Sequence, residues 1–325
     1  MNINLTIIGA GLIGRKRALA LPKETKLSLI CDVDAKRGLQ FAKDFNCEYE
    51  SDWKKVIGNP NIQAVMVCTT NNWLAPITLA AIRKGKHVLA EKPGAISFSE
   101  LESIYSEHKK NPTVVMYGYN HRYHPGIVKA KELVDSEEFG EVLFIRARYG
   151  HGGRLGYEKE WRFQKDISGG GELIDQGSHL IDLTRYFCGE MTDVEGFTST
   201  LFWKTKLEDT SFFVLRNRKN QYAHLSVTCI EWKNIFSFEI MLRTAKIQID
   251  GLGGSYGKEK LVLYTMKPEM GPPEMQEFAF SDKDISWEQE NEIFFDRIKK
   301  RDYSSDSIEN ALYVMRMIEE LYKRK

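Results

Sequence analysis

The stretch Asn4-Leu-Thr-Ile-Ile-Gly9-Ala-Gly11-Leu-Ile-Gly14 decides the fold of the first part of this chain. A short run of β-forming residues, 4–8, leads into three glycines with the spacing GxGxxG and then into a segment, up to Leu21, that predicts a helix. In such a turn the first glycine allows a tight bend, the second lets the backbone approach a pyrophosphate, and the third packs helix against strand. The pattern therefore predicts a dinucleotide site with its phosphates at a helix N-terminus.

An acidic residue follows at the distance that this kind of site needs. Asp32 ends the second predicted strand, 26–31. Its carboxylate is expected to accept hydrogen bonds from the adenosine ribose and to repel a 2′-phosphate, which favours NAD over NADP. Lys36 and Arg37 soften that repulsion, and we expect Arg37 to stack on the adenine or to lie in solvent.

The first 119 residues alternate between strand-like and helix-like segments. Further strands are predicted at 64–68, 87–90 and 113–117, and helices at 35–44, 51–57, 73–84 and 99–108. The run 64–68 is almost continuously apolar, as expected of a strand that is buried on both faces. This alternation predicts βαβ units, and hence a doubly wound parallel sheet of the Rossmann type over residues 1–119.

A different pattern begins near Asn120 and defines the second predicted domain, 120–325. We expect helices at 126–134 and 172–187, a strand at 142–149, and several longer antiparallel strands between 193 and 280 with a hairpin turn at 216–221. Apolar residues from Ile308 to Tyr322 keep helical spacing. The second domain is therefore predicted to be α+β, with the last helix packing back on the first domain.

Composition excludes several classes of protein. The 325 residues carry 46 Lys and Arg against 45 Asp and Glu, a net charge of +1, so no field steers the chain onto nucleic acid or an anionic membrane. No apolar run is long enough to span a bilayer, and the first eight residues lack the basic start of a signal peptide. The five cysteines are scattered without zinc-ligand spacing, which indicates reduced thiols, a cytoplasmic location and no metal site.

Two further segments carry residues suited to catalysis. Lys92 follows the predicted strand 87–90, and the carboxyl ends of strands face the ligand in a doubly wound sheet. Asp175 and His179 are four residues apart in the predicted helix 172–187, so one helical face presents a carboxylate and an imidazole. Gly169-Gly-Gly171 precedes this helix and Gly177 lies within it, which indicates that another group approaches closely there.

Together these motifs resemble the glucose–fructose oxidoreductase, inositol dehydrogenase and rhizopine catabolism family (Gfo/Idh/MocA). The resemblance rests on GxGxxG, Asp32, Glu91-Lys-Pro93, and the run from Gly169 to His179, and it extends to Asn120-His-Arg122-Tyr-His-Pro125. It implies an α/β fold in which a Rossmann domain precedes an α+β domain with an open-faced, mainly antiparallel sheet. It also implies nicotinamide-dependent hydride transfer at a secondary alcohol or ketone of a sugar, cyclitol or nucleotide sugar.

Carried over residue by residue, the resemblance makes Lys92, Asp175 and His179 the catalytic group. Histidine titrates near neutral pH and suits removal of a hydroxyl proton, while a lysine can stabilise the developing alkoxide or act as the base itself. The residues leave open which of the two is the base. The cofactor is expected to contact Gly9, Gly11, Leu12, Ile13, Gly14, Asp32, Arg37, Thr69, Asn71, Glu91, Lys92 and Asn120.

The sequence departs from the family at Cys68-Thr-Thr-Asn71-Asn-Trp-Leu74, where Thr70 replaces a usual proline and Leu74 a usual histidine. We therefore expect the nicotinamide-side pocket to differ in detail from that of the family. Arginines and aromatic residues around the catalytic helix suggest a polyhydroxylated substrate, alone or linked to phosphate or a nucleotide. The residues expected at the substrate are Lys92, Arg122, Tyr123, Arg154, Trp161, Arg162, Asp175 and His179.

The same residues allow two rival functions, and the second domain also predicts an oligomeric state. The rivals are NAD-assisted cleavage of a glycoside and a non-catalytic dinucleotide sensor, although a sensor has no need of the Lys92 and His179 that are present. An apolar open sheet face needs cover, so a homodimer or homotetramer is expected. The alternating residues Leu143, Ile145, Ala147 and Tyr149 are predicted to form that face.

Overall fold

The computed structural model describes residues 3–269, 271–281 and 283–324. These residues form two compact units. The first unit comprises residues up to Tyr119 together with 166–169 and 287–315, and the second comprises 120–165, 170–286 and 316 onwards. Each unit has its own sheet, and the two are described separately below.

The first unit is built on six parallel strands in the order β3-β2-β1-β4-β5-β6. The predicted parallel sheet of the Rossmann type is thus confirmed. The strand β3 was not predicted, because three residues with the sequence Glu-Tyr-Glu show no apolar run. The strands are β1 (Asn4–Ile8), β2 (Lys26–Cys31), β3 (Glu48–Glu50), β4 (Ala64–Val67), β5 (His87–Glu91) and β6 (Val115–Gly118).

Helices of this unit cover the apolar strands. Leu5 and Ile7 of β1, Met66 of β4 and Phe294 of α9 are all buried in one cluster. Strands whose side chains are buried in this way match the apolar runs seen in the sequence. The helices are α1 (Leu12–Leu19), α2 (Ala35–Phe45), α3 (Trp53–Gly58), α4 (Asn71–Arg83), α5 (Phe98–Lys110), α9 (Ser286–Lys300) and α10 (Asp306–Lys323).

The second unit is built on eight strands in the order β14-β13-β12-β11-β7-β10-β9-β8. All neighbouring pairs are antiparallel except β7 with β10, so the mainly antiparallel sheet is confirmed. The predicted hairpin is also confirmed, because Arg216 pairs with Tyr222 across the turn. The strands are β7 (Val142–Gly150), β8 (Asp193–Ser199), β9 (Thr210–Arg216), β10 (Tyr222–Thr228), β11 (Ile235–Leu242), β12 (Ala245–Asp250), β13 (Lys260–Thr265) and β14 (Glu274–Ala279).

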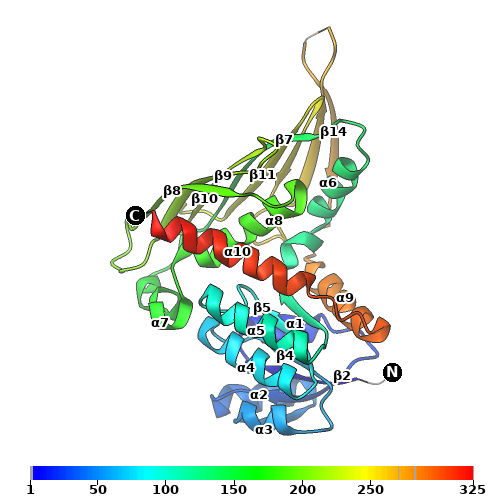
Figure 1. Ribbon diagram of the computed structural model, residues 1–325, viewed down its shortest axis with the longest axis vertical. Helices are drawn as coiled ribbons and strands as arrows, with labels where there is room; N and C mark the ends of the chain where they lie inside the picture. Colours follow the sequence, from blue (N-terminus) through cyan, green and yellow to red (C-terminus); the bar gives the residue numbers. More distant parts are fainter. Residues whose placement is uncertain (1–2, 270, 282, 325) are drawn as a thin grey trace. The chain divides into compact units, whose positions relative to one another are not determined.

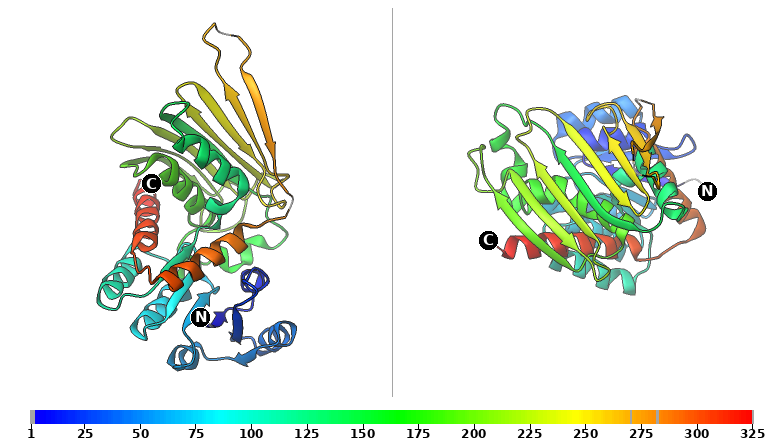
Figure 2. Two further views of the ribbon diagram at one scale, coloured as in Figure 1. Left: turned by 90° about the vertical axis from the view of Figure 1, so that its right-hand side faces the viewer. Right: turned by 90° about the horizontal axis from the view of Figure 1, so that it is seen from above.

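Two helices, α6 (Pro125–Asp135) and α8 (Ser178–Cys188), pack on the same face of this sheet (Figures 1 and 2). Ile145, Ile240 and Ile247 lie in one cross-strand row on that face, and all three are fully buried. The remaining short helices of the unit are η1 (Asn120–Tyr123), η2 (Tyr157–Lys159), η3 (Trp161–Phe163) and the π-helical turn η4 (Leu173–Gly177), and α7 (Lys165–Ser168) leads from this unit into the first.

This arrangement corrects the predicted open face. Ile145, Ala147 and Tyr149 are buried on the face that the helices cover, and Leu143 is 39% exposed. Alternation along β7 separates two sets of side chains, but the set that the helices cover depends on where those helices pack. The open face instead carries Phe197, Phe212, Val214 and Tyr222, which are 77%, 51%, 37% and 43% exposed.

Within the described residues, no helix is long and apolar enough to cross a membrane. All five cysteines are free thiols, as their scattered positions predicted.

Candidate active site

The glycine turn of the first unit has the geometry of a phosphate cradle. Gly9 has φ +108°, and a Cβ there would lie 2.4 Å from the carbonyl oxygen of Cys68. A Cβ on Gly14 would lie 1.9 Å from the carbonyl oxygen of Gly9, so both positions require glycine. A Cβ on Gly11 would meet no atom within 4 Å. The space over Gly11, at the N-terminus of α1, therefore fits a pyrophosphate.

Asp32 lies at the end of β2 and is held by four hydrogen bonds. Its Oδ2 accepts from the backbone N–H of Ala10 at 2.7 Å, and its Oδ1 accepts from the N–H of Asp34 at 2.9 Å. Arg37, whose side chain is 48% exposed, donates to both oxygens, at 3.1 and 2.7 Å. Burial alone would raise the pKa of Asp32, but these hydrogen bonds outweigh it and lower that pKa.

Lys92 directly follows β5, and its neighbour Glu91 is anchored in the core. The buried Arg17 guanidinium pairs with Glu91 at 2.8 Å and with Glu290 at 2.6 Å, and it stacks on Trp287. This ion-pair cluster anchors the end of β5, and Lys92 is the next residue. One carboxylate oxygen of Glu91 is therefore paired with Arg17. Glu91 thus anchors the end of the strand, in addition to the cofactor contact that the sequence predicts for it.

The segment 68–74, where the sequence departs from the family, runs into α4 and buries two of its side chains. Leu74 is fully buried within α4, an environment that suits its apolar side chain. Asn71 is also buried and donates from Nδ2 to the carbonyl oxygen of Ser168 at 2.9 Å. The hydroxyl of Thr69 donates to the carbonyl oxygen of Thr70.

In the second unit the predicted helix 172–187 is continuous but begins with the π-helical turn η4 before α8. A π-helical turn often marks a functional position in a helix. Asp175 lies in η4 and His179 in the first turn of α8. The glycines predicted that another group approaches the backbone closely here. In the structure, residues of the same chain make such approaches. A Cβ on Gly170 would lie 2.1 Å from the Tyr322 hydroxyl, and one on Gly171 would lie 2.1 Å from the Glu208 carbonyl oxygen.

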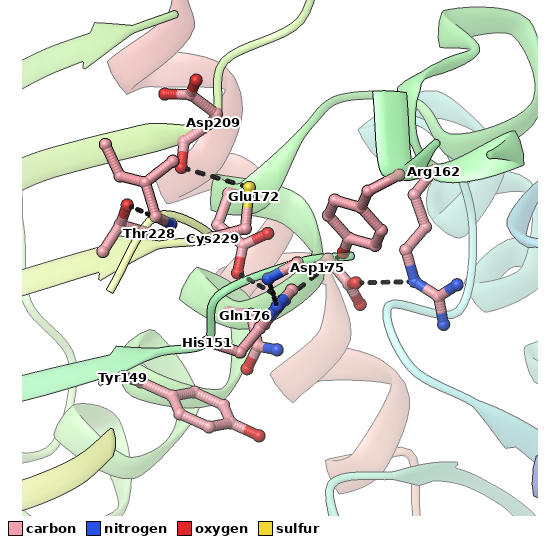
Figure 3. A network of polar contacts seen from close by, with 12 residues as sticks. Tyr149, His151, Arg162, Glu172, Asp175, Gln176, Asp209, Thr228 and Cys229 are labelled. Atoms are coloured by element: carbon pink, nitrogen blue, oxygen red, sulfur yellow. Dashed lines mark hydrogen bonds and ion pairs between the residues drawn. The ribbon is translucent and has the colours of Figure 1, made fainter. Parts of the chain in front are cut away.

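A polar network surrounds Asp175 near the carboxyl ends of β7 and β10 (Figure 3). Arg162 donates from Nε to Asp175 at 3.1 Å and also contacts Glu160 at 3.3 Å. His151 lies beside Glu172, with 3.6 Å between Nε2 and Oε1, and its Nε2 is 3.3 Å from the Tyr157 hydroxyl.

The tautomer of His151 follows from its backbone contact. The N–H of Gly153 donates to Nδ1 at 3.0 Å, so a neutral ring carries its proton on Nε2 and directs it toward Tyr157 and Glu172. Burial lowers the pKa of His151, which favours this neutral form. The network therefore combines a neutral imidazole, a carboxylate held by an arginine, and a hydroxyl.

The other predicted substrate residues are placed as follows. Arg122 forms a bidentate pair with the buried Asp182, with distances of 2.6 to 3.1 Å. Arg154 pairs with Glu160 and is 67% exposed. Trp161 lies under the Arg162 guanidinium at 4.8 Å, and Tyr123 is partly buried. Within this unit the structure therefore groups Trp161, Arg162 and Asp175.

Several residues at this site were not given a role by the sequence. His121 stacks on His179 with ring centroids 3.6 Å apart, while Tyr149, His151 and Glu172 complete the polar network. His151 had one available signal, because it stands between a predicted strand and Gly152-Gly153. Among the described residues, no group of three His, Cys, Asp or Glu side chains could hold a metal ion.

Comparison with known proteins agrees with this geometry. The family model described as "Oxidoreductase family, NAD-binding Rossmann fold" matches residues 3–119, and that of the "GFO/IDH/MocA C-terminal domain" matches residues 127–249. The chain therefore belongs to the Gfo/Idh/MocA family of oxidoreductases, and residues 3–119 match its NAD-binding part.

Relatives with known activities are similar over part of the chain. Levoglucosan dehydrogenase of Pseudarthrobacter phenanthrenivorans is 32% identical over 212 residues, which cover 61% of this chain and 54% of that protein. Myo-inositol 2-dehydrogenase of Thermotoga maritima is 29% identical over 193 residues, covering 58% and 55%. The 2,7-anhydro-N-acetylneuraminate hydratase of Mediterraneibacter gnavus is 23% identical over 244 residues, covering 72% and 62%. The chain thus spans about half the length of the first two.

A solved structure shows the same fold. Levoglucosan dehydrogenase in complex with NADH and levoglucosan superposes with a TM-score of 0.91, at 22% sequence identity, over 100% of this chain and 97% of that one.

Proposed function

We propose that this protein is an NAD-dependent oxidoreductase acting on a secondary alcohol or ketone of a sugar, cyclitol or nucleotide sugar. One observation carries the proposal: a chain with an NAD-binding domain also holds, in its second unit, a helix with the buried His179 and the arginine-held Asp175. The names of two relatives, a levoglucosan and a myo-inositol dehydrogenase, support this substrate class.

NAD, when bound, supplies the acceptor or donor of hydride, and Gly9, Gly11, Gly14 and Asp32 are the residues that would hold it. We propose NAD rather than NADP because the Asp32 carboxylate lies at the end of β2. The other proposed cofactor contacts are Leu12, Ile13, Arg37, Thr69, Asn71, Glu91, Lys92 and Asn120.

Side chains of the protein would move the proton of the substrate hydroxyl. His179 takes the proton of the substrate hydroxyl as the carbinol is oxidised, or returns it in the reverse direction. The Lys92 ammonium donates a hydrogen bond to the developing alkoxide, and it is the alternative base. Asp175, oriented by Arg162, accepts a hydrogen bond from the substrate hydroxyl or balances the charge on protonated His179. Arg122, Tyr123, Arg154 and Trp161 are the remaining proposed substrate contacts.

The test is a screen of sugars, 1,6-anhydro sugars, cyclitols and nucleotide sugars with NAD, in which NADH absorbance is followed. With an active substrate, His179→Ala should lower turnover by about 10²–10⁴-fold while NAD affinity is retained. Lys92→Ala should lower turnover by at least as much. Normal turnover in both variants would contradict this mechanism and favour a sensor.

A second candidate is cleavage or hydration without net oxidation, as the hydratase name of one relative suggests. In such a reaction a substrate carbon is oxidised and later reduced on the same enzyme. The two candidates differ in their products, because NADH accumulates in the first and not in the second. Product analysis alongside the absorbance screen therefore separates them.

We also propose a homodimer or homotetramer assembled through the open sheet face, in a cytoplasmic setting. Phe197 and Phe212 are cross-strand neighbours on that face, and both are more than half exposed. Apolar surface of this kind favours burial against a second copy. We further propose that residues 1–119 act as the cofactor domain and 120–325 as the substrate and assembly domain.

A further inference from the structure

His121 and His179 form a stacked pair of imidazoles in the second unit. Their ring centroids are 3.6 Å apart and their planes differ by 13°. Both residues are buried, with exposed fractions of 6% and 5%. Since His179 is the proposed proton acceptor, the charge state of the ring stacked on it bears directly on the chemistry.

A chain of hydrogen bonds assigns the tautomer of His121 from one side. The Ser286 hydroxyl donates to Asp284 at 2.6 Å, so its oxygen is left to accept from the Asn120 amide nitrogen at 2.9 Å. The amide oxygen of Asn120 therefore faces Nδ1 of His121, at 3.1 Å. Because that oxygen can only accept, Nδ1 must carry a proton.

The other nitrogen of His121 faces a hydroxyl. Nε2 lies 3.0 Å from the Tyr149 Oη. Burial raises the pKa of Tyr149 well above its usual range, so its O–H is retained and can donate to Nε2. Both ring nitrogens are thus satisfied in the neutral ring with its proton on Nδ1.

Other titratable groups also surround the pair. The His124 ring meets His121 edge-on at 5.6 Å, and its own Nδ1 lies 3.2 Å from Glu259. The Tyr256 ring packs against Tyr149 at 4.9 Å, and Asp175 precedes His179 on the same helix. Two positive charges on rings 3.6 Å apart would repel, so the pair favours a single proton.

We propose that His121 is a positioning residue for His179. It is a neutral ring with a fixed tautomer whose face orients the His179 imidazole and stabilises its protonated form by a cation–π contact. The hydrogen bonds of His121 keep it neutral, so the proton taken from the substrate resides on His179. This inference deepens the proposed function and rests on His179 as the proton acceptor.

The first test needs no substrate. In ¹⁵N NMR spectra of the intact protein, His121 should show a protonated Nδ1 and an unprotonated Nε2, and it should not titrate before His179 as the pH falls. Asn120→Ala should remove the preference for that tautomer. A proton on Nε2, or protonation of His121 before His179, would overturn the proposal whatever the enzyme's activity.

The second test uses kinetics with an identified substrate. His121→Leu, which removes the aromatic face, should lower kcat about tenfold or more with little change in KM. It should also move the acidic limb of the pH profile to lower pH by about 0.5–1 unit, the size expected for a desolvated cation–π contact. His121→Phe keeps the face and should leave that limb close to its original position.

The control is His224→Phe, since His224 is an exposed residue of β10. It should leave kcat and the pH profile unchanged.

Tyr149→Phe provides a second variant if His121→Leu fails to fold, and it should raise the pKa of His121 in the NMR titration. An unshifted limb in a folded His121→Leu protein would overturn the proposal, whereas normal turnover in His179→Ala would instead defeat the proposed function.

Discussion

Tyr322 donates a 2.6 Å hydrogen bond to the carboxylate of Glu208, and these two residues lie against Gly170 and Gly171, which precede the helix that carries Asp175 and His179. The same carboxylate oxygen accepts from the backbone N–H of Gly171 at 3.0 Å and of Leu173 at 3.2 Å. Glu208 thus satisfies backbone donors at the start of η4, as the side chain of an N-cap residue does in other helices. Asp175 is positioned from this anchored end.

Gly170→Ala should destabilise the protein, because the new methyl group would lie 2.1 Å from the Tyr322 hydroxyl. A cost of about 1–3 kcal/mol is expected for such overpacking. Chemical denaturation measures it, with Gly58→Ala as control, since a Cβ on Gly58 meets no atom within 4 Å. Adding Tyr322→Phe should recover part of the loss, and strictly additive effects would contradict the close contact.

Arg17→Met should be far more costly than the same change at Arg15. Arg17 is fully buried between Glu91 and Glu290, so its removal leaves buried carboxylates without their cation, at about 3–5 kcal/mol. Arg15 pairs with Asp44 at the surface, with 41% of its side chain exposed, and its loss should cost about 1 kcal/mol or less. Comparable unfolding free energies for the two variants would show that the buried cluster contributes little.

Arg37→Met should raise the pKa of Asp32 toward its ordinary value. Hydrogen bonds from Arg37 help to lower that pKa in the folded protein, so ionised Asp32 stabilises the fold above its unfolded pKa of about 3.9. That contribution is lost as the pH falls through the folded pKa. Carbon-13 NMR of the Asp32 carboxyl carbon in the cofactor-free protein measures the shift. Lys36→Met is the control, and equal titration in both variants would remove Arg37 as the cause.

Phe212→Asp should weaken self-association without unfolding the chain. Its side chain is 51% exposed on the open face and lies opposite Phe197 across the β8–β9 pair, so a carboxylate there opposes apolar burial between copies. Sedimentation should give the unmodified protein a mass above 37.5 kDa at micromolar concentration and the variant a lower one. A monomeric unmodified protein would exclude the proposed assembly.

Asp32→Ala should narrow the preference for NAD(H) over NADP(H), because it removes the charge that repels a 2′-phosphate. Calorimetry of both cofactors with each protein measures the change. Tighter binding of NADP(H) by the unmodified protein would reverse the assignment.

The sequence by itself predicted what depends on near neighbours in the chain. The glycine turn, the parallel strands of the first unit and the 216–221 hairpin follow from local spacing and apolar runs, and all three are present. The likeness to the family also came from short motifs, each of which is a run of neighbouring residues. Local sterics and periodicity act over a few residues, so a sequence displays them directly.

Only the tertiary structure decided which face of the second sheet is covered and what surrounds the candidate catalytic residues. Alternation along β7 is the same whichever face α6 and α8 pack on, so the sequence could not place Ile145 inside. His121 meets His179, and Tyr322 meets Glu208, across long stretches of chain. Such contacts arise from packing between distant elements, and no periodicity along the chain encodes them.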